Sequence, residues 1–257
     1  TRLKKEYGFK TMLPSHEAFA KENIISVEQK VRTHAQVMYD LGINVDFAPT
    51  VDILNKANPT IGKYGRSFGT NTDTIVSYAS AFTRGLSAKG IVPVIKHYPG
   101  QGSTLIDTHK TAANSSATFS RTEEIPFTKM LANNSLGVMV SHIVVSDIST
   151  EPASLSKEHI DRLRTIPEFH GLVFSDDYDM GAIIKEYPLN TLVAKAINAG
   201  VDVLVFSNNI TTYNPNEFYK VRIAIEKGIT DGTIKEEMIN RAYERIITFK
   251  KEKGIIK

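Results

Sequence analysis

The stretch at residues 91–110 (IVPVIKHYPGQGSTLIDTHK) constrains the fold of this chain more than any other. Its apolar run at 92–95 predicts a strand of a buried parallel sheet. Lys96 and His97 follow at once, and Pro99 with two nearby glycines prevents the strand from continuing. An apolar strand that ends in charged residues and runs into a glycine-containing loop is typical of an α/β enzyme. The plainer alternative is an ordinary strand with a solvated end, but four polar candidates within fourteen residues favour a site.

Short apolar strands alternate with amphipathic helices along the rest of the chain. Strands are expected near residues 43–48, 92–95, 137–141, 172–174 and 201–206. Helices are expected from Ser26 to about residue 41 and over residues 72–89, 120–134, 156–164, 189–199, 217–227 and 235–253. This order predicts a parallel sheet covered by helices, either a barrel or a doubly wound sheet.

Polar residues follow several of these strands, and this distribution decides between the two architectures. They are Asp46, Lys96, His97, His142, Asp176, Asp177 and Asn208. No glycine-rich dinucleotide fingerprint or phosphate-binding loop follows a strand. The pattern favours a (β/α)8 TIM-type barrel with its site at the carboxyl ends of the strands. Because a closed barrel has eight strands and five are found, we expect a single domain over residues 1–257 that lacks the first three.

Composition excludes several other classes of protein. The 257 residues are 41% hydrophobic and 23% charged, which is typical of a globular enzyme. A net charge of +3 without a basic stripe does not suggest a nucleic-acid partner. The chain has no cysteine and no apolar run of about 20 residues, so we expect neither thiolate metal sites nor a membrane span. We expect a cytoplasmic location, or export if a signal lies upstream of residue 1.

Two acidic candidates are adjacent, in the segment SDDYDM. Neighbouring residues of a strand point to opposite faces, so at most one of Asp176 and Asp177 should face a pocket. The other carboxylate is expected to be structural, and Asp177 or Asp179 could cap a helix that begins at Met180. One of the pair is therefore a candidate for chemistry.

Asp107 and His109 lie two residues apart, a spacing that places both side chains on one side of an extended segment. The carboxylate could then raise the pKa of the imidazole and tune it for proton transfer near neutral pH. A loop Asp and His that only bond to nearby backbone are the equal alternative.

Arg66, Lys96 and His97 offer many hydrogen-bond donors and few acceptors, which suits a polyhydroxylated or anionic ligand. No metal site is expected, because Lys96 would repel a cation and neither a His-x2–4-His pattern nor a carboxylate cluster occurs. One carboxylate plus one proton-transferring group is the minimum set for cleavage of a glycosidic bond with retention.

At these residues the chain resembles glycoside hydrolase family 3, and specifically its single-domain bacterial β-N-acetylhexosaminidases. The matching segments, which lie in the family's order, are NVDFAPTVDI (44–53), GRSFG (65–69), KHYPGQGSTLIDTH (96–109), VMVSHIV (138–144) and VFSDDYDMGA (173–182). The resemblance implies a (β/α)8 barrel that takes a carbohydrate substrate, without a cofactor, and releases terminal N-acetylglucosamine by double displacement. Such enzymes act in peptidoglycan or chitin-oligosaccharide turnover.

The resemblance also implies roles for individual residues. Asp176 would be the nucleophile, His109 the acid/base, and Asp107 the partner of His109. Sugar-binding positions would be Arg66, Lys96, His97 and, less directly, Arg2. The family's usual K-H-F-P-G-H-G reads KHYPGQG here, with Tyr98 and Gln101 as departures.

Three alternatives stay open at this point. A phosphorylase of the same type would use phosphate in place of water, since a His acid/base does not repel phosphate. A two-domain β-glucosidase of the family is disfavoured by the D-T-H loop. An inactive sugar-binding fragment is the third, and an upstream segment or a partner chain could complete the barrel.

Overall fold

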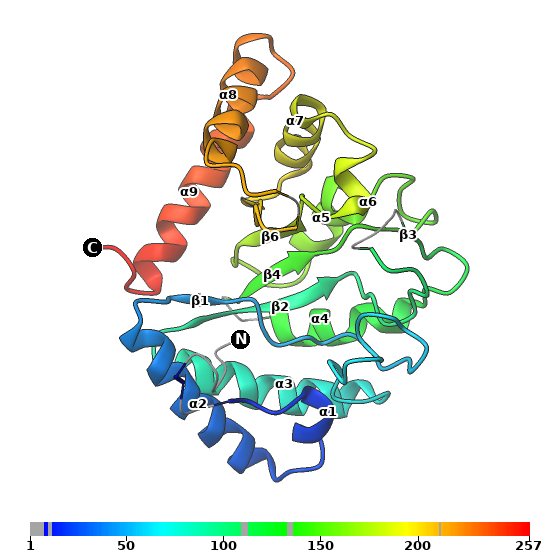
Figure 1. Cartoon of the computed structure of the whole chain (residues 1–257), viewed down its shortest axis with the longest axis vertical. Coiled ribbons are helices and arrows are strands. Elements are labelled where there is room, and N and C mark those ends of the chain that lie inside the picture. Colours follow the sequence, from blue (N-terminus) through cyan, green and yellow to red (C-terminus); the bar gives the residue numbers. More distant parts are fainter. Residues whose placement is uncertain (1–7, 10–11, 109–112, 133–135, 211) are drawn as a thin grey trace.

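The main sheet has five strands in the part of the chain that the structure describes, and all neighbouring pairs are parallel. This computed structural model describes residues 8–9, 12–108, 113–132, 136–210 and 212–257. The spatial order is β1-β2-β4-β6-β7, and each successive main-sheet strand lies beside the one before it (Figure 1). The strands are β1 (Val45–Asp46), β2 (Val92–Tyr98), β4 (Gly137–Val140), β6 (Val173–Asp177) and β7 (Val203–Val205). A small second sheet pairs β3 (Ala113–Asn114) with β5 (Ile143–Val144).

Helices connect the strands, as expected for successive β-α units. The longer ones are α2 (Ile24–Asp40), α3 (Thr72–Ser87), α5 (Lys157–Arg164), α7 (Leu189–Ala199), α8 (Glu217–Thr230) and α9 (Glu236–Glu252). Shorter ones are α1 (His16–Phe19), η2 (Arg121–Glu124), α4 (Ile125–Leu131), η3 (Ala153–Leu155) and α6 (Gly181–Ile184). No helix in the described ranges is both long and apolar enough to cross a membrane.

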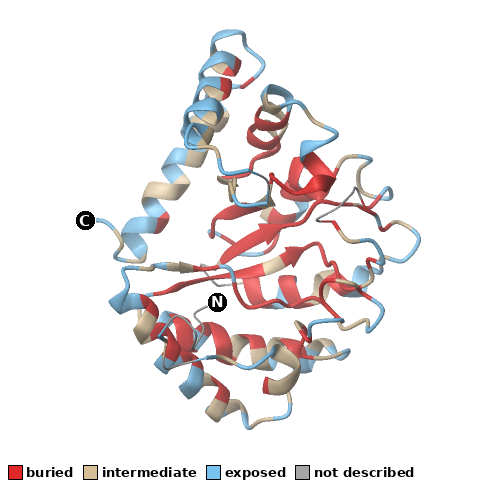
Figure 2. Cartoon of the chain, viewed as in Figure 1, coloured by how far each residue is buried: buried red, intermediate tan, exposed pale blue. Residues whose placement is uncertain are grey.

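Alternation along the strands divides the core into two faces. Val94 of β2 and Phe174 of β6 belong to one apolar cluster, which also takes in Phe249 of α9. Ile95 and Val173 belong to the other, where they pack with residues of α2 to α5. Figure 2 shows β2, β4 and the inward sides of α2 and α3 as buried, whereas α8 and α9 are mostly exposed. The two faces therefore differ in how fully helices cover them.

Several element ends differ from those that the sequence predicted. The helix expected from Ser26 begins at Ile24, because the Asn23 side chain accepts a hydrogen bond from the Ile25 N–H (2.9 Å). Ser120 does cap its segment through a capping box with Glu123, as the S-x-x-E spacing suggests. Residues 133–135, the end of that predicted helix, lie outside the described residues.

The strands also differ in length from the prediction. β1 has two residues in place of six, whereas β2 continues through Lys96 and His97, where the prediction ended it. β2 continues because the segment after β1 pairs with it: the Lys96 N–H donates to Pro49 and the Val51 N–H donates to the Lys96 carbonyl.

An ion-pair cluster lies at the amino-terminal ends of the strands. Asp202 directly precedes β7 and is buried. Its carboxylate binds Arg164 of α5 (2.5 Å) and Arg245 of α9 (2.6 Å), and it also accepts the Val173 N–H (2.8 Å). Asp202 thus ties two helices to the start of β6.

Candidate active site

The carboxyl ends of β2, β4 and β6 meet at one edge of the sheet. Tyr98 lies opposite Val140, and Val140 lies opposite Ser175. Because the strands are parallel and in this register, Lys96 and His97 are brought close to Asp176, and electrostatic coupling joins them. Polar residues of β2 and β6, with His142 just after β4, therefore share one site, at the end of the sheet where barrel enzymes bind substrate.

The structure separates the adjacent carboxylates Asp176 and Asp177. Alternation puts Asp176 on the face of Phe174, the same face that carries Val94 and Lys96. Asp177 instead accepts hydrogen bonds from the N–H groups of Asp179 (3.1 Å) and Ser207 (3.0 Å). Asp177 is thus a structural residue that joins the ends of β6 and β7.

The capping role considered for Asp177 or Asp179 is wrong. The N-cap of α6 is Met180, and no side chain caps this helix. The Asp179 carboxylate accepts the Asn208 N–H instead (2.6 Å). Both carboxylates are used by the segment after β7, so neither is left for the helix.

Asp176 is half-buried and ionised. Burial acts to raise its pKa, but His97, His142 and the Asp177 N–H, with Lys96, outweigh that effect, and the net pKa is lowered. One oxygen accepts the Asp177 N–H (2.9 Å), and the other has no hydrogen-bond partner within the described ranges. A carboxylate with a lowered pKa and an uncommitted oxygen can act as a nucleophile.

Lys96 is also half-buried, and its pKa is lowered to about 8. Burial is the main cause and the Arg66 charge adds to it, whereas Asp176 opposes the shift. Its ammonium group is therefore mostly charged at neutral pH and becomes neutral in mildly alkaline solution.

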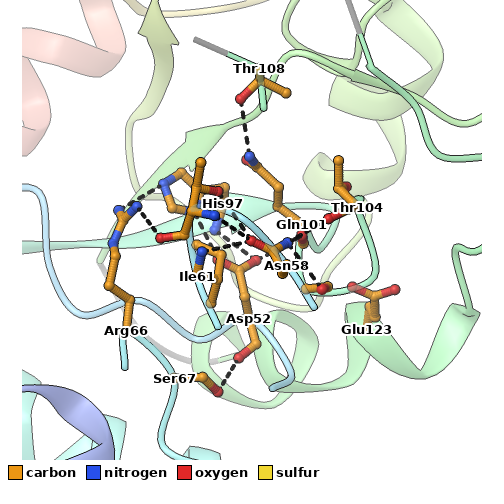
Figure 3. A network of polar contacts seen from close by, with 12 residues as sticks. Asp52, Asn58, Ile61, Arg66, Ser67, His97, Gln101, Thr104, Thr108 and Glu123 are labelled. Carbon is orange, nitrogen blue, oxygen red and sulfur yellow. Dashed lines mark hydrogen bonds and ion pairs between the residues drawn. The ribbon is translucent and has the colours of Figure 1, made fainter. Parts of the chain in front are cut away.

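Asp52 fixes the orientation of His97 (Figure 3). The Asp52 side chain is fully buried, and its Oδ2 lies 2.7 Å from His97 Nδ1. Its Oδ1 accepts the N–H groups of His97 (3.2 Å) and Gln101 (2.8 Å). Burial lowers the pKa of His97, with Asp52 opposing, so the neutral ring carries its proton on Nδ1 and leaves Nε2 as an acceptor.

Arg66 approaches that acceptor from the long loop after β1. Its Nη2 lies 3.5 Å from His97 Nε2, and its Nη1 donates to the Thr60 carbonyl (3.2 Å). The Arg66 carbonyl lies 2.7 Å from the Nδ1 of His16, whose pKa burial lowers to about 4. The predicted sugar-binding set of Arg66, Lys96 and His97 is thus brought together.

Asn58 connects the two loops that frame this site. Its side-chain oxygen accepts the N–H groups of Thr60 (2.9 Å) and Ile61 (2.6 Å). Its side-chain nitrogen donates to the carbonyls of Gln101 (2.7 Å), Gly102 (3.1 Å) and Thr104 (2.8 Å), as Figure 3 shows in part. Asn58 is buried, so these bonds hold the loop after β1 against the loop after β2.

The loop that carries Asp107 crosses from β2 toward the segment that follows Asp176. The Thr108 carbonyl accepts the Ala182 N–H of α6 (3.3 Å), and its hydroxyl accepts the Gln101 amide (3.1 Å). Asp107 itself is half-buried. His109, its predicted partner, and Arg2 lie outside the described residues, so their predicted roles stay predictions.

His142 supports the backbone beside Asp176. Its Nε2 lies 2.9 Å from the Asp177 carbonyl and its Nδ1 lies 2.7 Å from the Ser154 hydroxyl. Burial lowers the pKa of His142. A carbonyl oxygen can only accept a hydrogen bond, so the neutral ring donates from Nε2. Its Nδ1 then accepts a hydrogen bond from the Ser154 hydroxyl.

Sequence reasoning missed Asp52 and Asn58 as site residues. Asp52 stood within the segment NVDFAPTVDI, but five residues separate it from Asp46, at the end of β1, so it was not read as a strand-end carboxylate. Asn58 lies in a long loop with no local pattern, and only the folded loop shows its contacts. No group of three or more metal-ligating His, Asp or Glu side chains occurs among the residues that the structure describes.

The sequence model of the Glycosyl hydrolase family 3 N terminal domain matches residues 3–249, nearly the whole chain. The chain belongs to glycosyl hydrolase family 3. A Beta-hexosaminidase LpqI of Mycobacterium tuberculosis is 32% identical over 248 residues, which are 92% of this chain and 62% of that protein. A Beta-hexosaminidase of Actinobacillus succinogenes is 34% identical over 212 residues, 78% of this chain and 60% of that protein.

Solved structures of the family agree with this membership. LpqI of M. tuberculosis superposes with a TM-score of 0.83 at 31% identity, over 92% of this chain and 70% of that one. A family 3 β-N-acetylglucosaminidase of Paenibacillus sp. str. FPU-7 has a TM-score of 0.85 at 27% identity, over 95% of this chain and 47% of that one. The predicted α/β fold is confirmed, and the curved parallel sheet is part of the family 3 barrel. The chain spans about three fifths of the length of these curated relatives.

Proposed function

We propose that this chain is a part of a retaining β-N-acetylhexosaminidase that releases terminal β-linked N-acetylglucosamine. The observation that carries the proposal is the state of Asp176, whose pKa is lowered among His97, His142 and Lys96. One of its oxygens has no hydrogen-bond partner among the residues that the structure describes. Two of the relatives are named β-hexosaminidases, and one solved structure is a β-N-acetylglucosaminidase. These names support the choice of an N-acetylated sugar.

The reaction proceeds in two displacements. In the first, a carboxylate oxygen of Asp176 forms a bond to the anomeric carbon while the bond to the leaving oxygen breaks, and His109 gives its proton to that oxygen. In the second, water attacks the anomeric carbon, returns a proton to His109, and releases Asp176. Asp107 orients the imidazole and stabilises its protonated form.

Recognition of the sugar is assigned to Arg66, Lys96 and His97. The Nε2 of His97 accepts a hydrogen bond from a sugar hydroxyl, because Asp52 holds the other ring nitrogen in its protonated form. Arg66 and Lys96 donate to hydroxyl or carbonyl oxygens of the ligand. Arg2 has the same proposed task from the start of the chain.

The direct test is trapping of the glycosyl-enzyme. Incubation with an activated fluorinated N-acetylglucosaminide should add one sugar to the intact mass, and peptide mapping should place that sugar on Asp176. The matched control is Asp177→Asn, which lies on the opposite face and should still be labelled. Labelling of a different residue, or turnover by Asp176→Asn at the wild-type rate, would overturn the assignment.

The same assay separates hydrolysis from phosphorolysis. With an ordinary, unfluorinated substrate, the enzyme-bound sugar is transferred either to water or to phosphate. The products are therefore compared with and without inorganic phosphate. We expect free N-acetylglucosamine in both cases. If a sugar 1-phosphate forms in proportion to phosphate, then phosphate and not water accepts the sugar in the second displacement. The first displacement would be the same in both cases.

A further inference from the structure

The loop from Pro99 to Thr108 has a firmly held first half. The Gln101 N–H donates to Asp52, and the carbonyls of Gln101, Gly102 and Thr104 accept from Asn58. A side chain at Gly102 would collide with the Ile53 carbonyl, so the loop packs directly on that segment. This half is therefore fixed to the body of the sheet.

The second half of the loop contains two exposed apolar side chains. Leu105 and Ile106 are 55% and 42% exposed. Thr108 is then buried again, with its hydroxyl against the Gln101 amide (3.1 Å) and its carbonyl against the Ala182 N–H (3.3 Å). The Gln101–Thr108 hydrogen bond thus closes the loop across its exposed tip.

Stability alone does not explain a glutamine at this place. Gln101 is 3% exposed, and its side-chain oxygen has no hydrogen-bond partner among the described residues. A buried amide that leaves its acceptor unmatched is less favourable than an apolar side chain of similar shape. The bond to Thr108 is the contact that an apolar residue could not make.

We propose that Gln101 is a positioning residue that holds Thr108, and with it the neighbouring Asp107, against the start of α6. The inference rests on the proposed function, because it assigns the contact that keeps the acid/base loop beside Asp176. An uncharged amide and an uncharged hydroxyl form the contact. Gln101 acts through Thr108 and does not touch the reacting atoms.

Hydrogen exchange tests the contact without any substrate. Thr108→Val keeps the branched shape and removes the hydroxyl, and loss of one neutral hydrogen bond should speed exchange at the Ala182 amide and in residues 105–108 about fivefold. Thr108→Ser should exchange like the wild type. The matched control is Thr104→Val, which removes another buried hydroxyl of the same loop, one that bonds Ser115, and should leave the Ala182 amide unchanged.

Gln101→Met gives an independent check. It removes the amide, so exchange at Ala182 should rise as in Thr108→Val. The free energy of unfolding should not fall in step with that rise, because the variant also removes the side-chain oxygen, which has no hydrogen-bond partner in the described part of the chain. Wild-type exchange in both variants, or an equal rise in Thr104→Val, would overturn the proposal.

Kinetics then separate this role from the proposed function. Thr108→Val should lower kcat/KM about tenfold more on a poorly activated leaving group than on an activated aryl one, because only the former needs the proton donor. Thr108→Ser should restore the wild-type ratio. A wild-type chain that hydrolyses neither substrate would refute the function, while the exchange result would still decide the contact.

Discussion

Asp52 and Asp176 both lie near His97, yet their surroundings give them different tasks. Asp52 is fully buried and accepts hydrogen bonds from two N–H groups and from the His97 ring, so both oxygens are occupied. Asp176 is half-buried and, among the described residues, accepts one hydrogen bond, from the N–H of its neighbour Asp177. The first carboxylate is therefore committed to orientation and the second is available for chemistry.

Asp52→Asn should switch the tautomer of His97. The side-chain oxygen of the asparagine would still accept the hydrogen bonds from the two backbone N–H groups. The side-chain NH2 group would face His97 Nδ1 and force the ring proton onto Nε2, toward Arg66. We expect kcat/KM to fall by about 10- to 100-fold, as for other partners that orient a histidine. Nitrogen-15 NMR of His97 should show the proton on Nδ1 in the wild type and on Nε2 in the variant. Asp73→Asn, at an exposed carboxylate, is the control; an unchanged His97 spectrum in Asp52→Asn would contradict the expectation.

Lys96 should make ligand binding sensitive to alkaline pH. Its pKa of about 8 means that the ammonium is charged below that pH and neutral above it. Affinity for N-acetylglucosamine, the proposed ligand, measured by titration calorimetry from pH 6.5 to 9.5, should therefore fall about fivefold as the charge-assisted hydrogen bond is lost. Lys96→Met should bind more weakly and show no such step. A flat wild-type profile would remove Lys96 from the binding set.

At the scale of elements, loops carry more of the site than strands do. The loop after β1 supplies Asp52, Asn58 and Arg66, and the loop after β2 supplies Gln101 and Thr108. Periodicity locates strands and helices, but the register between two loops depends on side-chain contacts such as those of Asn58. For that reason strand ends could single out Lys96 and one of Asp176 and Asp177 as candidates, whereas Asp52 and Asn58 could not be found in this way. The nucleophile role of Asp176 came from the family resemblance and stays a prediction.

Gly102→Ala should loosen the contact between these loops. The added methyl group would meet the Ile53 carbonyl oxygen, so the loop must move away from the Asp52 segment. Overpacking of this kind should lower the free energy of unfolding by about 1–3 kcal/mol. Urea denaturation measures it, and Ser103→Ala, which removes an atom from the same loop and adds none, is the control. Equal stability of Gly102→Ala and wild type would refute the close packing.

Across the whole molecule, buried histidines link stability to pH. Burial lowers the pKa of His159 to about 4, with the Arg162 charge adding to the shift, and burial also lowers the pKa values of His97 and His142. The unfolded chain takes up these protons near pH 6.5, whereas the folded chain resists them until a lower pH. Stability is therefore lost as the pH falls below about 6.5.

For His159 alone, the free energy of unfolding should fall by about 3 kcal/mol between pH 6.5 and 4, and it should not fall further below pH 4. Urea denaturation at pH 7.5, 5.5 and 4.5 measures the total, to which Glu123, with a pKa raised by burial, contributes in the opposite direction. His159→Asn should reduce the slope, and His170→Asn, at an exposed ring, should not. An unchanged slope in His159→Asn would contradict the assignment.

The order of elements could be predicted from the sequence, and the confirmed fold follows from it. Apolar runs bounded by glycine and proline located the five main-sheet strands that the structure describes, most clearly β2 and β4, which are almost wholly buried. Strand ends could not be placed, since β2 continues through Lys96 only because the Pro49–Val51 segment pairs with it. A single domain over residues 1–257 stays a prediction.

Asp202 and the candidate site lie at opposite ends of the strands. The ion pairs of Asp202 hold α5, α9 and β6 at one end, and the loops with Asp52, Asn58 and Gln101 lie at the other. Laboratory evolution can therefore randomise the exposed loop positions Leu105 and Ile106 in search of new sugar preferences while the anchoring end keeps its sequence. Libraries built this way should keep a higher share of folded variants than libraries of equal size drawn across the chain.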